Sequence, residues 1–264
     1  MRSIKITLFL LFLSITPVFA QLNISVSSSY ALRSSPDLII SSSETSTFLT
    51  SYSETTSLHS FGSGLRLNLD FSYRFKKPFI LGLQSSYLLG SVFEQKNMSA
   101  SVVTYRVKYQ GRSLQFIPYL GFELGSFRFP IQFGAGPVIA NNRTILSSKS
   151  EEVVNYRAAK LVIYGGWNVG AFAFGKIIFP FGERLSCFGE ISMVQMSMET
   201  KSGEITEYIE NGTDLTSQLS EESRIIKFSR TSVDPINNPD NNTNPAQRYP
   251  FSSLNFGLGL SYRF

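Results

Sequence analysis

The sequence predicts an all-β protein, an eight-stranded antiparallel up-and-down transmembrane β-barrel, on three observations. Residues 254–264 alternate strictly between apolar and polar or small side chains, the period-two pattern of a strand with one apolar face. Of the 264 residues, 14% are aromatic and only 16% charged, and the dominant aromatics, Phe and Tyr, favour pleated surfaces. Connections between the expected strands alternate between long and short, which is typical of a barrel whose turns are tight on one side of a membrane.

The N-terminus is expected to be a secretory signal peptide over residues 1–20, which leaves 21–264 as the barrel domain. Arg2 and Lys5 precede a short apolar run, and a small-residue cleavage site ends at Ala20. The run is too short to span a membrane as a helix. The formal net charge is +5, and without these two cations it falls to about +3, too weak and scattered to indicate nucleic acid binding.

The first three expected strands each have an apolar and a polar face. Residues 22–33 alternate between apolar and polar or small side chains. Residues 64–75 alternate completely, with Leu, Phe and Tyr on one face and Arg, Asn, Asp and Ser on the other. A turn at Lys-Lys-Pro separates this segment from 79–93, whose apolar residues again recur at every second position.

The next four strands are expected at 114–126, 130–140, 159–176 and 185–198. Pro118 and Pro137 lie within two of them, and because proline cannot donate to a strand ladder, we expect the pairing to fray there. The pattern leaves the phase of the third of these strands open. The final strand, 254–264, completes the count of eight.

The connections carry as much information as the strands. The odd-numbered ones are expected to be long external loops, at about 34–63, 94–112, 141–158 and 199–248. The even-numbered ones are short and are expected to be periplasmic turns. The alternative fold, a soluble periplasmic β-sandwich, gives no reason for this alternation, and it would extract without detergent.

One apolar stretch, residues 161–181, could be mistaken for a membrane helix. Its several glycines, Pro180 and Lys176 weaken a helix and oppose insertion as one. A barrel instead spans with short alternating segments, in which each backbone polar group is paired with a neighbouring strand.

The closing segment resembles the C-terminal signature of bacterial outer-membrane β-barrels. Phe264 is the last residue, Tyr262 stands two before it, and Leu260 continues the apolar series. In that family this strand closes the barrel and is recognised by the barrel-assembly machinery during insertion. The resemblance therefore implies an insertion signal at these residues and location in the cell outer membrane.

Charges of both signs fall on the expected inward faces. An eight-stranded barrel is just wide enough for its own side chains to fill it, and enclosed charges must be paired. The candidates for a salt-bridged network that closes the lumen are Arg66, Asp70, Arg74, Glu123, Glu190 and Arg263. By strand depth, Arg74, Glu123, Glu190 and Arg263 are expected toward the periplasmic half. A gated conduit is the alternative.

Residues 118–125, PYLGFELG, resemble the second strand of the transmembrane domain of OmpA-type proteins, and the overall pattern is similar to OmpX-like barrels. In that family an inward Glu pairs with lumen Arg and Lys residues. The resemblance implies this role for Glu123, and we suggest Arg74 as its partner.

Catalytic chemistry is not expected. Enzymes of this architecture use a His near the outer rim, and the single His, His59, is best interpreted as a solvated loop residue. The only Cys, Cys187, suits a small apolar strand position and excludes an internal disulfide. No ligand pattern for a metal and no cofactor-binding motif is present.

The sequence thus favours a non-enzymatic outer-membrane protein with a structural or surface-interaction role through its external loops. The expected partners are outer-membrane lipid and lipopolysaccharide, the assembly machinery, and an unknown external partner. A narrow channel for small solutes is the alternative, and a lipid-modifying enzyme using His59 is a weaker one.

Overall fold

The structure, a computed structural model, describes residues 21–34, 60–76, 78–98, 104–125, 129–151, 156–229 and 243–264. The expected signal peptide and His59 lie outside these ranges, as does most of the first expected loop. The helices within the described ranges are short, and none has the length and hydropathy to cross a bilayer.

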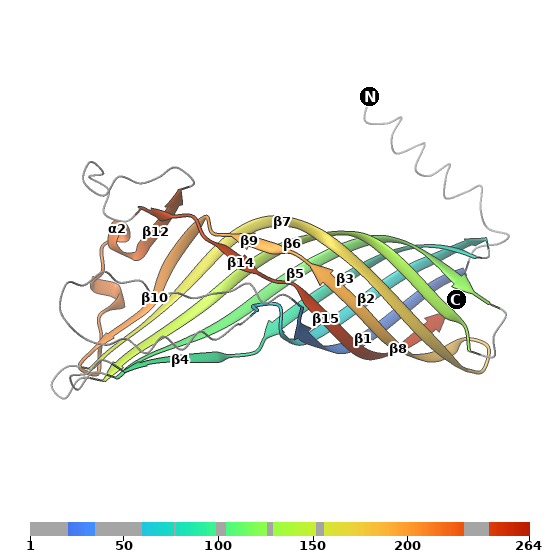
Figure 1. Ribbon diagram of the computed structural model, residues 1–264, viewed down its shortest axis with the longest axis horizontal. Helices are drawn as coiled ribbons and strands as arrows, with labels where there is room; N and C mark the ends of the chain where they lie inside the picture. Colours follow the sequence, from blue (N-terminus) through green and yellow to red (C-terminus); the bar gives the residue numbers. More distant parts are fainter. Residues whose placement is uncertain are drawn as a thin grey trace, which may run out of the picture.

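Long antiparallel strands pair in a closed ring (Figure 1). In spatial order the ring contains β1 (Gln21–Arg33), β2 (Gly64–Lys76), β3 (Phe79–Gly90), β5 (Thr104–Leu124), β6 (Ile131–Glu151), β7 (Tyr156–Phe181), β8 (Leu185–Gln195) and β15 (Ser253–Arg263). β15 also pairs with β1, so the sheet has no free edge over these strands. We call the end that holds Leu22 and Phe264 the inner end, and the opposite end the outer end.

Further strands extend the structure at the outer end. They are β4 (Phe93–Met98), β9 (Ser197–Glu199), β10 (Ser202–Glu210), β11 (Thr213–Asp214), β12 (Ile225–Ser229), β13 (Thr243–Pro245) and β14 (Arg248–Pro250). A 3-10 turn, η1 (Thr216–Gln218), and one helical turn, α2 (Glu221–Arg224), connect β11 to β12. Toward the outer end, β5, β6 and β7 extend beyond the ring. Together with the flanking strands β4 and β10 they form what we call the outer sheet (Figure 1).

The total of eight strands is therefore wrong, although eight strands make up the ring. The ranges 94–112, 141–158 and 199–248, expected as loops, contain all of β10, most of β4, about half of β5 and of β6, and the first residues of β7. These segments have few apolar residues in alternation, which is the signal that sequence reasoning uses. Their strands form because neighbouring backbones satisfy one another's hydrogen bonds, for example from Thr104–Glu151 to Phe116–Ile139 between β5 and β6.

Side chains alternate between outside and inside along the ring strands. In β3 the exposed and buried positions follow one another almost without exception. The alternation predicted a polar interior, but several apolar side chains also point inward and are buried: Leu88, Ile117, Val138, Phe172, Phe174 and Val194. They fill the space that a ring of this size encloses.

Two local irregularities explain the positions that sequence reasoning left open. The β5–β6 ladder skips from the Phe116–Ile139 pair to the Leu120–Ala135 pair, so it is interrupted around Pro118 and Pro137. The β6–β7 register shifts next to Asn142, where Gly166 has a positive φ of 64°. This bulge reverses the phase of β7 partway along its length.

Candidate functional site

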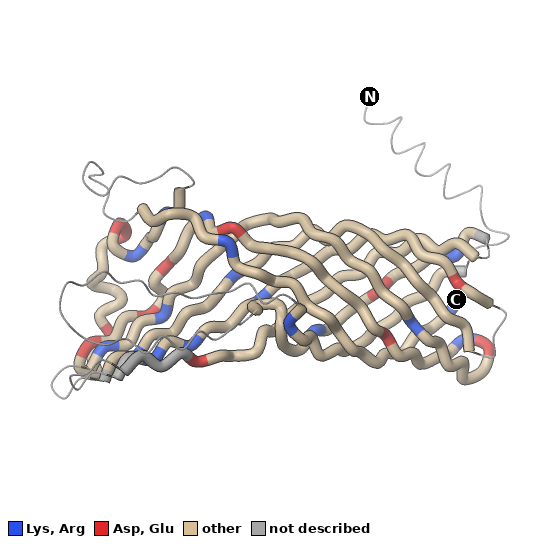
Figure 2. Tube along the Cα trace, in the orientation of Figure 1, with Lys and Arg blue, Asp and Glu red and all other residues tan. Residues whose placement is uncertain are grey.

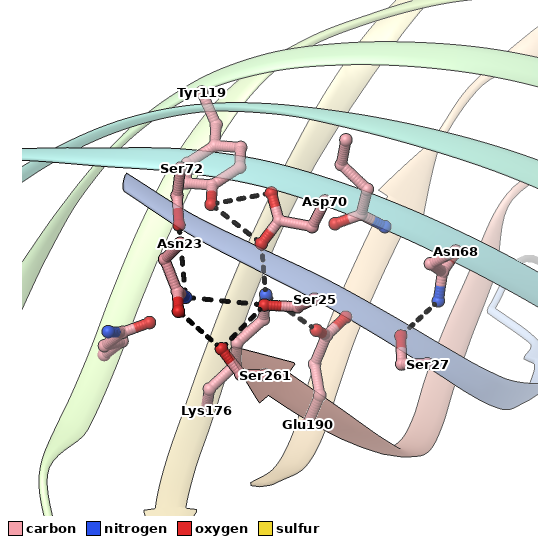
Figure 3. Close-up of polar contacts among 12 residues, drawn as sticks. Asn23, Ser25, Ser27, Asn68, Asp70, Ser72, Tyr119, Lys176, Glu190 and Ser261 are labelled. Atoms are coloured by element: carbon pink, nitrogen blue, oxygen red, sulfur yellow. Dashed lines mark hydrogen bonds and ion pairs between the residues drawn. The ribbon is translucent and has the colours of Figure 1, made fainter. Parts of the chain in front are cut away.

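A cluster of buried charges lies inside the ring, between strands that are distant in sequence (Figure 3). Lys176 on β7 donates from Nζ to Asp70 Oδ2 on β2 at 3.1 Å, and it lies 3.3 Å from Glu190 Oε2 on β8. Tyr119 on β5 donates its hydroxyl to both Asp70 oxygens, at 2.9 and 3.1 Å. This central cluster joins four strands across the interior.

The central cluster is enclosed by aromatic rings and by a further charge. The ammonium of Lys176 lies 4.7 Å from the ring centroid of Phe174 and 5.0 Å from that of Phe188, within cation–π distance. Arg66 is buried on β2, donates from Nη2 to Ser253 Oγ at 3.2 Å, and interacts electrostatically with Glu190. With Arg66 included, the two cations balance the two carboxylates.

A chain of small polar side chains lies beside the central cluster. Ser25 on β1 donates to Ser261 on β15 at 3.1 Å, and Ser261 donates to Asn23 Oδ1 at 2.7 Å. Farther along β1, Asn68 donates to Ser27 at 3.0 Å and accepts from Ser86 at 2.7 Å. These bonds link β1, β2, β3 and β15 across the inner surface, and Figure 3 shows those that join β1 to β2 and β15.

A second ion pair lies at the inner end. Arg74 on β2 is paired with Glu123 on β5, and Gln132 Nε2 donates to the same Glu123 oxygen at 2.8 Å. Arg263 lies nearby and lines, with Asn23, Ser72, Arg74, Ile80 and Gln132, a cavity of about 10 Å³. That volume is about what one water needs.

An aromatic cluster lies at the outer end of the ring. Phe61, just before β2, places its ring 5.4 Å from Phe93, 6.4 Å from Tyr109, 5.1 Å from Tyr249 and 5.8 Å from Phe251 (centroid distances). Phe61 and Phe251 are fully buried. Burial raises the pKa of Tyr249, on β14, to about 12, so its hydroxyl stays neutral and donates to Gln247 Oε1 at 2.9 Å.

Backbone contacts hold the aromatic cluster in the mouth of the ring. Phe61 N donates to Pro250 O at 3.0 Å, and Ser60 Oγ donates to Ser252 O at 2.9 Å. A Cβ at Gly111 would lie 2.3 Å from Phe61 O, so this glycine lets the segment approach β5 closely.

The structure brings together some of the residues singled out from the sequence and separates others. Arg74 and Glu123 form the suggested pair. Glu190 was expected at the same depth as that pair, but it lies against Lys176 and interacts with Arg66. The strands are tilted, so positions at equal distance from the strand ends do not lie at equal depth in the barrel.

Sequence reasoning missed Lys176 and Tyr119 as members of the network. From the sequence, Lys176 counted only against a membrane helix, since the phase of its strand was open. The available signal was its isolation: a lone cation within the apolar stretch 161–181 requires a buried counter-charge.

The proposed insertion signal lies on the outside of the ring at the inner end. Leu260, Tyr262 and Phe264 are all exposed, and Phe264 N donates to Leu22 O at 3.0 Å. Within the described ranges, no group of three or more His, Cys, Asp or Glu side chains is placed to hold a metal ion.

Comparisons with known proteins give only distant structural similarity. No family model matches the chain, and no curated protein matches it. It is similar to a major outer membrane protein from Thermus thermophilus, with 9% identity, a TM-score of 0.43, and 93% of this chain and 99% of that one covered.

Two structures from Acinetobacter baumannii are also similar. For CarO the identity is 11% and the TM-score 0.34, over 75% of this chain and 92% of that one. For CarO2 the identity is 10% and the TM-score 0.36, over 92% and 99%. These values are too low to assign the chain to a family.

Proposed function

We propose that the protein is an integral β-barrel of the bacterial outer membrane, with a closed interior and a non-enzymatic role at the cell surface. The observation that carries this proposal is the distribution of side chains, which is the reverse of that in a water-soluble protein. Large apolar residues are exposed on every ring strand, whereas Arg66, Asp70, Lys176 and Glu190 are buried inside. Such a continuous exposed apolar surface is unfavourable in water and suits a lipid environment.

The exposed aromatic residues support a membrane position because they gather near both ends of the apolar band. Toward the outer end they are Tyr30, Tyr87, Phe116 and Trp167, and toward the inner end Phe79, Phe122, Phe133, Phe179, Tyr262 and Phe264. Aromatic girdles at the two interfaces are typical of transmembrane barrels. The C-terminal strand at the inner end would then present its exposed residues to the assembly machinery.

Three groups of side chains inside the ring support a structural or surface-interaction role over passage of solutes. The aromatic cluster lies at the outer end, the central cluster lies in the middle, and the Arg74–Glu123 pair lies at the inner end. What distinguishes the chain from a minimal barrel is the outer sheet, built from β4, β5, β6, β7 and β10. We propose that this sheet, in place of flexible loops, presents the surface that an external partner contacts.

The single Trp of the chain tests the membrane position directly. Trp167 is 57% exposed, faces outward on β7 and lies in the outer girdle. In phosphatidylcholine bilayers, we expect lipids brominated near the headgroup end of the chain to quench its fluorescence strongly. Lipids brominated near the chain terminus should quench it less, because the residue lies at the interface.

A matched variant moves the probe along the lipid-facing surface. In Trp167→Phe/Leu258→Trp the new Trp replaces the middle of β15, where Leu258 is 74% exposed. This variant should reverse the order, with the deeper bromines quenching more. If neither set of lipids quenches Trp167, the barrel is not embedded as proposed.

A further inference from the structure

The lipid-facing surface of β5 and β6 changes character where the strands enter the outer sheet. Within the ring, this face of β5 and β6 carries apolar side chains, such as Leu114, Phe116 and Ile139. Farther toward the outer end, the same face of the same strands carries basic residues: Arg106, Lys108, Arg112, Arg143 and Lys149. Figure 2 marks Lys and Arg along this outer end.

One cross-strand row on this face, next to the apolar band, places like charges directly opposite one another. Arg112 on β5 is paired in register with Arg143 on β6. Directly opposed like charges destabilise a sheet, so this pair is unfavourable by itself.

Neighbouring strands add no acidic side chain to this row. It continues from Arg112 to Leu89 on β3 and from Arg143 to Tyr164 on β7. Among the described residues, the row therefore consists of two arginines flanked by an apolar and an aromatic residue.

Acidic side chains on this part of the sheet are directed to other cations. Glu94 lies opposite Lys108, and Glu207 opposite Lys160. Glu204 Oε1 lies 3.5 Å from Arg224 Nε.

Arg112 also has an unused donor. Its Nε is buried and has no hydrogen-bond partner among the described residues, while its Nη2 donates only a long bond, 3.4 Å, to Gln110. A guanidinium matches the oxygens of a phosphate in two parallel bonds.

The height of the Arg112–Arg143 row above the apolar band indicates which anion it would meet. Leu114, Asn141 and Trp167 form one cross-strand row at the top of that band. The Arg112–Arg143 row follows two residues farther along, about 7 Å at the rise of a strand. If the barrel is embedded as proposed above, this is the level of lipid phosphates.

We propose that Arg112 and Arg143 bind the phosphate group of an anionic lipid in the outer leaflet around the barrel. The inference rests on the proposed function, because it requires the apolar band to be in lipid. The Arg112–Arg143 row continues a lipid-facing strip, so the ligand reaches it from the membrane. A bound phosphate offsets the repulsion between the two arginines and fixes the depth of the barrel.

Selective quenching of Trp167 tests this site. The chain is reconstituted in phosphatidylcholine bilayers at low ionic strength, with a small fraction of lipid carrying brominated chains and either a phosphatidic acid or a phosphatidylcholine headgroup. We expect brominated phosphatidic acid to bind next to Trp167 about five-fold more tightly than its zwitterionic counterpart. In Arg112→Gln/Arg143→Gln this preference should fall to about one.

A charge-matched control removes two cations from elsewhere in the outer sheet. Arg157 lies on the opposite face of the outer sheet from Arg112 and Arg143, where it is paired with Glu210. Lys227 is exposed on β12. The variant Arg157→Gln/Lys227→Gln should keep the five-fold preference. Equal loss in both double variants would show a general effect of net charge and overturn the proposal.

The remaining outcomes separate this site from the membrane position and from a soluble ligand. Equal quenching of the unaltered protein by both brominated lipids overturns the site but leaves the embedded barrel intact. Quenching by neither lipid overturns the embedding, and the site with it. If millimolar inorganic phosphate abolishes the preference, the ligand is the free ion and the lipid assignment is overturned.

Discussion

Replacing Lys176 with methionine is expected to lower the free energy of unfolding by about 3–5 kcal/mol. The ammonium contacts both Asp70 and Glu190, and all three side chains are almost completely buried. Methionine retains the volume but leaves two carboxylates with the single compensating charge of Arg66. Urea unfolding of the protein in detergent micelles, followed by Trp167 fluorescence, measures the loss.

A second substitution distinguishes charge from packing. In Lys176→Met/Asp70→Asn one carboxylate is removed, and Glu190 remains with Arg66 as its counter-charge. The double variant should therefore be more stable than Lys176→Met alone, although it carries one change more. The exposed control Lys227→Met should stay within about 0.5 kcal/mol of the unaltered protein. No recovery in the double variant would show that the charges are not coupled.

Replacing Phe61 with alanine is expected to lower the free energy of unfolding by about 3–5 kcal/mol. Phe61 is fully buried and contacts four other aromatic rings at the outer end of the barrel. Its removal leaves a cavity that the segment around it cannot fill, since Gly62 and Gly111 already lie against backbone atoms.

The conservative variant Phe61→Leu keeps most of the apolar volume and should cost about 1.5 kcal/mol or less. Both variants are compared in the same urea titration. If Phe61→Ala and Phe61→Leu unfold at the same urea concentration as the unaltered chain, the aromatic cluster does not stabilise the outer end.

The ring could be predicted from the sequence because its signal is strictly local. Residues 64–75 and 254–264 alternate with period two, and β2 and β15 occupy almost these ranges. The outer sheet could not be predicted, because segments such as 147–151 are polar on both faces. Their strands are determined by pairing with β5 and β7, which a single-sequence pattern does not contain.

The interior was predictable in kind but not in detail. Inward charges follow from the alternation, and the sequence already suggested the pairing of Arg74 with Glu123. Lys176 was missed because the bulge at Gly166 hides the phase of β7. The aromatic cluster was missed because Phe61 and Phe251 lie outside the alternating segments, in connections that fold into the mouth of the ring.

Single-channel recording in a planar bilayer tests the closed, membrane-embedded barrel most directly. Insertion of the refolded chain is established in the same membranes by quenching of Trp167 with brominated lipid. The proposal predicts no sustained channels from inserted protein, because the aromatic cluster, the central cluster and the Arg74–Glu123 pair occupy the interior of a narrow ring. Reproducible channels from the unaltered chain would contradict a closed interior, and Arg66, Asp70 and Lys176 would then be the residues expected to set ion selectivity.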